Sequence, residues 1–132
     1  MTAYIVSELA SNGEAFDYVA AAGGLDDKFT RGLFLQVLAG VEHMHNKGVA
    51  HRDIKLENIF LDENCVPKVA DFGLAKAFAG ENGELLTTKL GTKNYMAPEL
   101  YSQEKPYDGP PVDVFALGAI LYMIRTATFC FN

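Results

Sequence analysis

Residues 51–58 read HRDIKLEN and bring carboxylates, cations, an imidazole and a carboxamide close together. Such groups are costly to bury unless they are paired, so this concentration indicates chemistry more than a plain solvated loop. Transfer of a phosphoryl group needs a carboxylate for the attacking hydroxyl, a cation near the transferring phosphate and oxygen ligands for Mg²⁺. Asp53, Lys55 and Asn58, with Asp71 further along the chain, have the required types. Mg²⁺ is often held by one or two protein groups, so Asn58 and Asp71 would suffice as its ligands.

A predicted hairpin positions these side chains. Two short apolar runs, residues 59–61 and 66–70, flank a turn at residues 62–64. HRDIKLEN precedes the first run, and the sequence DFG at 71–73 follows the second. We therefore expect the two acidic motifs to open side by side at the hairpin's ends.

The residues before HRDIKLEN predict one strand and two helices. Residues 4–9 (YIVSEL) are typical of a short buried strand, and Asn12-Gly13 indicates a turn after it. A short helix is expected over residues 14–22. A longer helix is expected over residues 28–47, with Gly48 as its C-terminal cap. Its predicted buried face comprises Leu33, Phe34, Val37, Leu38, Val41 and Met44.

A further helix is predicted to start at Pro111 and Asp113. Its apolar residues occupy every face, which is typical of a helix in the middle of a core. Only two earlier helices are available to cover it. The pattern therefore indicates that packing partners beyond this sequence are needed.

Composition limits the classes of partner and location. The chain has 132 residues and a net charge of -6, which disfavours nucleic acid and anionic membranes as partners. No apolar run is long enough to span a bilayer, and there is no secretory signal pattern. The two cysteines, Cys65 and Cys130, are too few for a disulfide framework, so we expect an intracellular, cytoplasmic protein. The oligomeric state is not indicated.

Four ordered motifs carry a family resemblance. HRDIKLEN, DFG, GTKNYMAPEL (91–100) and DVFALGAILY (113–122) resemble, in order and spacing, the catalytic loop, metal-binding loop, activation-segment end and central helix of eukaryotic protein kinases. The resemblance implies an α+β, protein-kinase-like fold with a mainly helical large lobe. Residues 1–13 would be the last small-lobe strand and the hinge, and residues 14–132 the first part of the large lobe.

The resemblance assigns roles to the charged residues. Asp53 resembles the catalytic base, Lys55 the cation that steadies the γ-phosphate of ATP, and Asn58 and Asp71 the Mg²⁺ ligands. Thr92 would bridge Asp53 and Lys55 by hydrogen bonds. The lysine two residues after Asp53, with GTKNYMAPE later, is similar to serine/threonine kinases rather than tyrosine kinases.

The resemblance also implies an adenine site in the first fifteen residues. Ser7 would be the gatekeeper, and the backbone of Glu8 and Ala10 would meet the adenine edge. Ala15 and the strand containing Phe60 would pack against the face of the ring.

Two acidic residues suggest a substrate preference. Glu14 resembles the acid that bonds the ribose or a substrate arginine, and Glu57 lies within the catalytic loop. A protein substrate with basic residues before the target hydroxyl would suit both. Calmodulin-dependent and AMP-activated kinase relatives are similar in this respect.

Arg52 suggests a switch. In kinases with arginine at this place, a phosphate on the activation segment pairs with it through charge-assisted bonds. Thr88 occupies the matching place. The alternative, that Thr88 is a polar loop residue, stays open because some relatives need no phosphate there.

Several family elements are absent from the sequence. There is no G-x-G-x-x-G loop and no lysine before Lys28, so a phosphate clamp is missing. Glu99 of the APE motif lacks its usual arginine and is expected to be a buried, unpaired carboxylate. We therefore expect a partial kinase domain that is inactive alone. The alternative is a kinase-derived binding module without catalysis, whose central helix docks on a partner.

Overall fold

The computed structural model describes residues 2–78, 86–101 and 106–131. Within these residues, the chain forms three α-helices, four short strands and several single turns of 3₁₀ helix. The helices are α1 (Ala15–Ala22), α2 (Asp27–Asn46) and α3 (Gly109–Thr126). The strands are β1 (Val49–Ala50), β2 (Ile59–Leu61), β3 (Pro67–Val69) and β4 (Lys76–Ala77). This mixture of helices and small sheets agrees with the expected α+β class.

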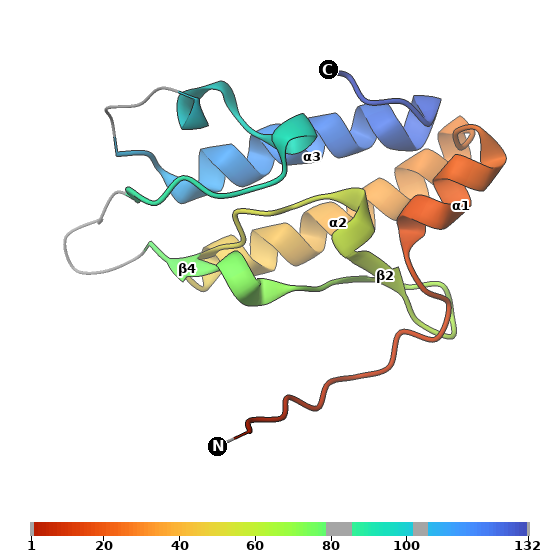
Figure 1. Ribbon diagram of the computed structural model, residues 1–132. Coiled ribbons are helices and arrows are strands. Elements are labelled where there is room, and N and C mark those ends of the chain that lie inside the picture. Colours follow the sequence, from red (N-terminus) through yellow and green to blue (C-terminus); the bar gives the residue numbers. More distant parts are fainter. Residues whose placement is uncertain (1, 79–85, 102–105, 132) are drawn as a thin grey trace.

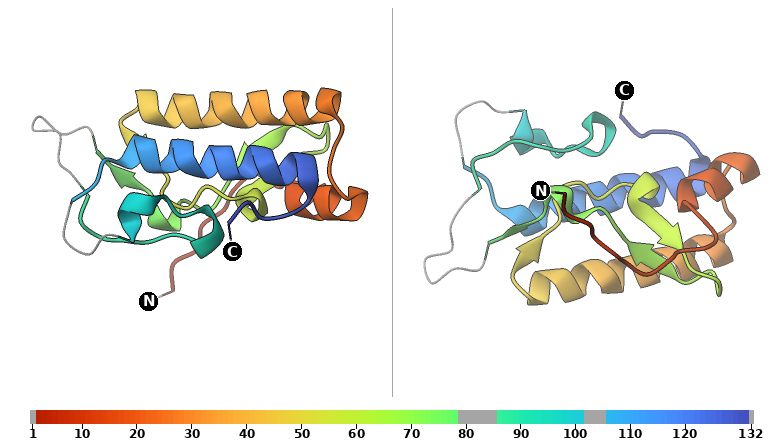
Figure 2. Two further views of the ribbon diagram at one scale, coloured as in Figure 1. Left: turned by 90° about the horizontal axis from the view of Figure 1, so that it is seen from above. Right: turned by 60° about the horizontal axis from the view of Figure 1, so that its bottom comes forward.

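Helices α2 and α3 form the centre of the molecule. They lie side by side and run in opposite directions, and β2 and β3 lie on one side of them (Figures 1 and 2). The main hydrophobic core fills the space between these elements and α1. Its buried members are Ala15, Val19, Val37, Val41, Met44, Ile54, Leu56, Ile59, Leu61, Tyr95, Ala116, Leu117, Ala119, Ile120, Met123 and Ile124.

The two small sheets place both acidic motifs together. β2 pairs with β3 in antiparallel fashion, so the predicted hairpin is confirmed. β1 pairs with β4, also antiparallel. HRDIKLEN therefore connects β1 to β2, and DFG connects β3 to β4. Because each motif links the same two sheets, their side chains face one region of the molecule.

Helix α2 forms where the apolar periodicity predicts it. The Asp26 side chain accepts from the Phe29 N–H at 2.9 Å and caps the first turn. Gly48, with a φ of 73°, follows the last turn and donates its N–H to the His45 carbonyl at 2.9 Å. Leu38 was wrongly assigned to the buried face, because it lies about 100° around the helix from buried Val37 and is 40% exposed.

Helix α3 begins two residues before its predicted start. Prolines 110 and 111 occupy its first turn, where a missing N–H is harmless. One side packs into the core, whereas Val114, Leu121 and Tyr122 are 59%, 39% and 47% exposed. The helix is thus apolar on a face that the described residues do not cover. Among those residues, no helix is long and apolar enough to cross a membrane.

The predicted strand over residues 4–9 is wrong for this chain. Residues 2–10 are extended but form no strand, and Tyr4, Ile5 and Val6 are 86%, 96% and 95% exposed. A strand needs a neighbour to bond its backbone, and no described segment supplies one. The N-terminal segment extends away from the helices and strands (Figure 1). The chain joins the rest of the molecule at Asn12, whose N–H donates to the Leu61 carbonyl at 3.0 Å.

The turn after α1 provides a test of packing against α3. Gly24 has a φ of 103°, and a Cβ atom there would lie 2.5 Å from the Arg125 carbonyl oxygen. Replacing Gly24 with alanine should therefore lower the free energy of unfolding by about 3 kcal/mol. Gly23→Ala is the matched control, because Gly23 also has a positive φ, 68°, but open space around its Cβ position. It should cost about 1 kcal/mol. Equal losses in urea titrations would contradict the proposed contact.

Candidate active site

A buried carboxylate on α3 holds the backbone of the HRDIKLEN loop. Asp113 is fully buried, and its two oxygens accept from the backbone N–H groups of His51 and Arg52, each at 2.8 Å. His45 of α2 adds a third contact, Nε2 to Oδ2 at 2.8 Å. This role of His45 could not be predicted from local sequence, because its partner lies 68 positions further along the chain.

Two non-glycine residues of the site have left-handed backbone conformations. Arg52 has a φ of 69° and Asp71 a φ of 61°. Such conformations cost about 1–3 kcal/mol and persist where the surroundings hold them. Asp113 holds the backbone of Arg52, and the Gly73 N–H donates to Asp71 Oδ1 at 3.2 Å. Strain at both acidic motifs is typical of functional sites.

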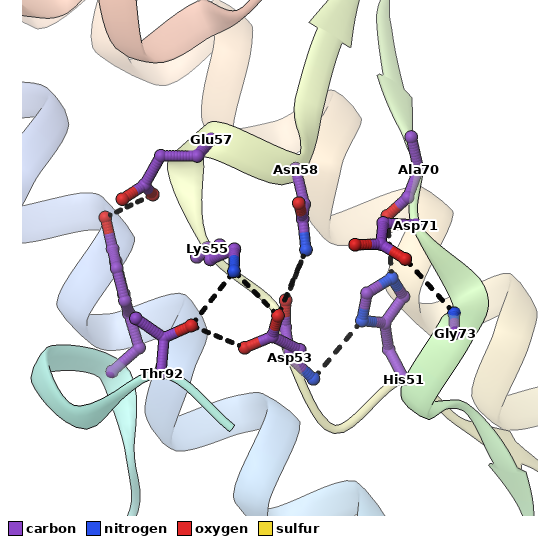
Figure 3. A network of polar contacts seen from close by, with 10 residues as sticks. His51, Asp53, Lys55, Glu57, Asn58, Ala70, Asp71, Gly73 and Thr92 are labelled. Atoms are coloured by element: carbon purple, nitrogen blue, oxygen red, sulfur yellow. Dashed lines mark hydrogen bonds and ion pairs between the residues drawn. The ribbon is translucent and has the colours of Figure 1, made fainter. Parts of the chain in front are cut away.

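His51 links the two motifs through both of its ring nitrogens. Its Nδ1 accepts from the Asp53 N–H at 3.3 Å, so this nitrogen carries no proton. Its Nε2 lies 3.0 Å from the Ala70 carbonyl and must donate to it. The ring therefore connects the loop of Asp53 to the residue that precedes Asp71 (Figure 3). Because both ring nitrogens already have hydrogen-bond partners within the protein, His51 has a structural role and is not positioned as an acid or base.

Asp53, Lys55 and Thr92 form a closed ring of polar contacts (Figure 3). Lys55 Nζ lies 2.8 Å from Asp53 Oδ2 and donates to Thr92 Oγ1 at 3.0 Å. Thr92 Oγ1 in turn donates to Asp53 Oδ1 at 2.8 Å. The hydrogen bonds expected of Thr92 are therefore present, although Thr92 is remote from the loop in sequence.

The contacts around Asp53 also determine its charge. Burial alone would raise the pKa of its carboxyl group. The hydrogen bonds from Lys55 and Thr92 and the charge of Lys55 outweigh burial and lower that pKa below its usual value. Asp53 is consequently a carboxylate at neutral pH, able to accept a hydrogen bond from a hydroxyl.

The oxygens of Asn58 and Asp71 are suited to a hard cation. Asn58 Nδ2 donates to the Asp53 carbonyl at 3.0 Å, and its Oδ1 forms no hydrogen bond with the described residues. The Ala70 N–H donates to the Asn58 carbonyl at 2.9 Å. This bond holds the start of β2 next to the end of β3. Amide and carboxylate oxygens are ligands that Mg²⁺ accepts, so this pair fits the metal.

A cleft of about 1070 Å³ adjoins the site. Ser7, Glu8, Ala10, Phe60 and Asp71 all line it, as the expected nucleotide site requires. Its size is sufficient for a nucleotide. The side chain of Glu8 also pairs with Lys68 of β3 at 3.1 Å, which draws the N-terminal segment toward the hairpin.

Two residues expected at the adenine and ribose do not line this cleft. Ala15 is 1% exposed and belongs to the main core, because the first turn of α1 directs it inward. Glu14 is half-buried and its backbone forms a bridge with Phe60. These two residues support the floor beside the cleft.

Glu57 is paired with Tyr95, a residue for which no motif predicted a role. The Tyr95 hydroxyl donates to Glu57 Oε2 at 2.9 Å. Burial, followed by the charge and hydrogen bond of Glu57, raises the pKa of Tyr95 well above its usual value. The hydroxyl therefore stays protonated and fixes the Glu57 carboxylate at the loop's surface.

The structure brings Arg52 close to Thr88 but not to its hydroxyl. Arg52 NH1 lies 3.4 Å from the Thr88 carbonyl oxygen, and the Thr88 residue is exposed. Glu99 is also exposed, so the expectation of a buried, unpaired carboxylate is wrong. Water solvates this carboxylate, because the described residues place nothing over it.

These motifs, now seen in one site, agree with a comparison to known families. The family model of the protein kinase domain matches residues 1–132. The chain belongs to the protein kinase family. The ring of Asp53, Lys55 and Thr92 joins the HRDIKLEN and GTKNYMAPEL motifs of this chain. Membership implies phosphoryl transfer to proteins as the family's activity.

Thr92 allows a test of positioning in this kinase. In a polypeptide that also has the glycine-rich loop and small-lobe lysine, Thr92→Ala should lower phosphotransfer roughly tenfold to a hundredfold, because the carboxylate loses a hydrogen bond that orients it. Thr92→Ser retains the hydroxyl and should keep most of the activity. The comparison is made by initial rates at saturating ATP. Equal rates for the two variants would contradict this role.

Proposed function

We propose that this kinase chain carries the transfer centre of a serine/threonine protein kinase. The observation that carries the proposal is the ring of contacts among Asp53, Lys55 and Thr92. The lysine of this ring follows the aspartate by two residues, as in serine/threonine kinases, and the threonine belongs to the GTKNYMAPE sequence. A substrate serine or threonine would place its hydroxyl oxygen beside the Asp53 carboxylate.

Asp53 acts mainly by orientation in this proposal. Its lowered pKa makes the carboxylate a weak base, so it takes the substrate proton late, as the hydroxyl oxygen bonds to phosphorus. Before that point it accepts a hydrogen bond and directs the hydroxyl in line. Lys55 Nζ lies 2.8 Å from Asp53 Oδ2 and would stabilise the negative charge that develops on the transferred phosphoryl group.

Asn58 and Asp71 would hold Mg²⁺, and Glu8, Ala10 and Phe60 would contact the adenine of ATP. Mg-ATP supplies the transferred phosphoryl group and a cation that neutralises its charge. Ala15 and Glu14 would support this site from below. Where a small lobe supplies a neighbouring strand, residues 1–13 would serve as hinge and last small-lobe strand, and residues 14–132 would be the first part of the large lobe. The α- and β-phosphates require a glycine-rich loop and a lysine that this sequence lacks.

Acidic groups near the loop support a basic protein substrate. Glu57 is fixed by Tyr95, and the chain has a net charge of -6. An arginine or lysine before the target hydroxyl would find a preoriented carboxylate there. Calmodulin-dependent and AMP-activated kinases are the relatives that this preference resembles. An intracellular location would suit such a substrate.

Regulation through Arg52 and Thr88 is also part of the proposal. A phosphate on Thr88 would present charged oxygens beside a buried guanidinium, because the carbonyl of the same residue already lies within reach of Arg52 NH1. The exposed position of Thr88 leaves it accessible to an activating kinase.

The test is transfer of labelled phosphate. A polypeptide containing this chain, a glycine-rich loop and the small-lobe lysine should phosphorylate peptides that have basic residues before serine or threonine, but not the same peptides with tyrosine. Labelling of tyrosine alone would refute the serine/threonine assignment. Absence of transfer with every peptide and with Mg-ATP bound would refute the activity.

A kinase-derived binding module is the second candidate. The exposed apolar residues Val114, Leu121 and Tyr122 of α3 favour it, since a docking face would have this character. Melting temperature distinguishes the candidates. If the protein is a kinase, Mg-ATP should raise the melting temperature of the polypeptide that also contains the glycine-rich loop and the small-lobe lysine. A binding module without catalysis need show no such rise.

A further inference from the structure

One tyrosine fastens part of the activation segment to the body of the kinase. Leu86 and Tyr107 form an antiparallel bridge, with both backbone N–H···O distances equal to 2.8 Å. The Tyr107 side chain is buried, and its hydroxyl donates to the Thr88 carbonyl oxygen at 2.8 Å. Leu86 itself is buried in a small cluster that includes Tyr107 and Val112. The segment 86–88 therefore has both backbone and side-chain attachments to Tyr107.

The same hydroxyl connects this segment to Arg52. It accepts from Arg52 NH1 at 3.3 Å while it donates to Thr88. The order of donors and acceptors is thus Arg52 NH1, Tyr107 hydroxyl, Thr88 carbonyl. Hydrogen bonds arranged in such a chain polarise and strengthen one another.

Arg52 has neutral oxygens as its partners. Its Nε donates to the Leu74 carbonyl at 2.6 Å, and its NH1 has the Thr88 carbonyl and the Tyr107 hydroxyl. The residue is 8% exposed, so these bonds offset the loss of water around the guanidinium. Among the described residues, no carboxylate forms an ion pair with it.

We propose that Tyr107 is a positioning residue that orders residues 86–88 on Arg52 while Thr88 is unphosphorylated. The proposal rests on the proposed roles of Arg52 and Thr88 and refines them. A phosphate on Thr88 reinforces an existing attachment and is not needed to create it. The uncharged tyrosine hydroxyl thus joins Arg52 to residues 86–88, a connection assigned above to the phosphate.

Amide hydrogen exchange tests this attachment on the 132-residue chain itself. Tyr107→Phe keeps the ring and the backbone bridge but removes the hydroxyl. The backbone amides at positions 86 and 107 should then exchange about tenfold faster, because the Thr88 carbonyl and Arg52 NH1 both lose a hydrogen-bond partner. The melting temperature should fall by a few degrees, because two buried hydrogen bonds are lost, while the gain in exchange should be concentrated at these two amides rather than in α2. Tyr101→Phe is the matched control, since it removes an exposed tyrosine bond to the Lys93 carbonyl, 3.0 Å, and should not affect either amide.

Phosphothreonine incorporated at position 88 provides the second measurement. In the Tyr107→Phe chain it should return both exchange rates to within about twofold of wild type, because the phosphate gives Arg52 a stronger acceptor. A purely structural loss would not be rescued in this way. Unchanged exchange in Tyr107→Phe, faster exchange spread over the whole chain, or absence of rescue would each overturn the proposal. The exchange measurements use no nucleotide and do not depend on catalysis. Failed phosphotransfer in a separate assay would therefore count against the proposed function alone.

Discussion

Asp53→Asn is expected to lower kcat for phosphotransfer at least a hundredfold. The amide cannot accept the substrate proton, and such groups contribute about 10²–10⁴ in rate. Binding of Mg-ATP should persist, because Asn58 and Asp71 keep their oxygens. We would measure kcat with a basic serine peptide and the Mg-ATP-induced rise in melting temperature on the same preparation. The polypeptide for this assay includes the glycine-rich loop and small-lobe lysine.

Two further variants separate the possible reasons for a loss. Asp71→Asn should abolish transfer and also diminish the Mg-ATP-induced rise, because it removes an anionic oxygen from the proposed metal site. Asp17→Asn, an exposed change on α1, should alter neither quantity. Retained turnover in Asp53→Asn would refute the role of Asp53. Loss of both quantities in Asp53→Asn would show that the residue acts through the fold.

Asp113→Ala should cause the largest loss of stability, about 3–5 kcal/mol. The substitution leaves the buried N–H groups of His51 and Arg52 without acceptors and removes the partner of His45. Unsatisfied buried donors cost about 1–3 kcal/mol each. Because small domains are stable by only about 5–15 kcal/mol, much of the chain's stability depends on this carboxylate. Urea titration followed by circular dichroism would measure the change.

The matched control for Asp113→Ala is Asp108→Ala. Asp108 lies at the N-terminus of the same helix, is exposed and makes no side-chain capping bond. Its loss should change the free energy of unfolding by no more than about 0.5 kcal/mol. Similar losses for both variants would show that helix-end charge, and not the buried hydrogen bonds, dominates the effect of Asp113.

Local patterns predicted much of the fold. The period of apolar residues predicted α2, and the paired apolar runs predicted the hairpin of β2 and β3, because these features depend on neighbours in the sequence. Residues 4–9 show where such patterns fail. Their composition is typical of a strand, but a strand forms only where another backbone segment can bond to it.

Some features of the site could likewise be predicted from local sequence, and others could not. HRDIKLEN and DFG contain the reactive groups within short stretches, so chemistry could be inferred before any arrangement was known. The orientation of Glu57 could not, since its partner Tyr95 is 38 positions away. Residue type indicated what Glu57 could bind, but its hydrogen bond to Tyr95 determines where its carboxylate lies.

By itself, the sequence determined the kinase motifs, their order and the side chains available for phosphoryl transfer. Only the tertiary structure decided that His45 shares the Asp113 carboxylate with the loop backbone, and that Tyr107 connects Arg52 to Thr88. The reason is physical. A buried donor or acceptor must be satisfied by whichever group packing brings to it, and between distant segments that group is determined by the packing of helices and sheets rather than by local sequence.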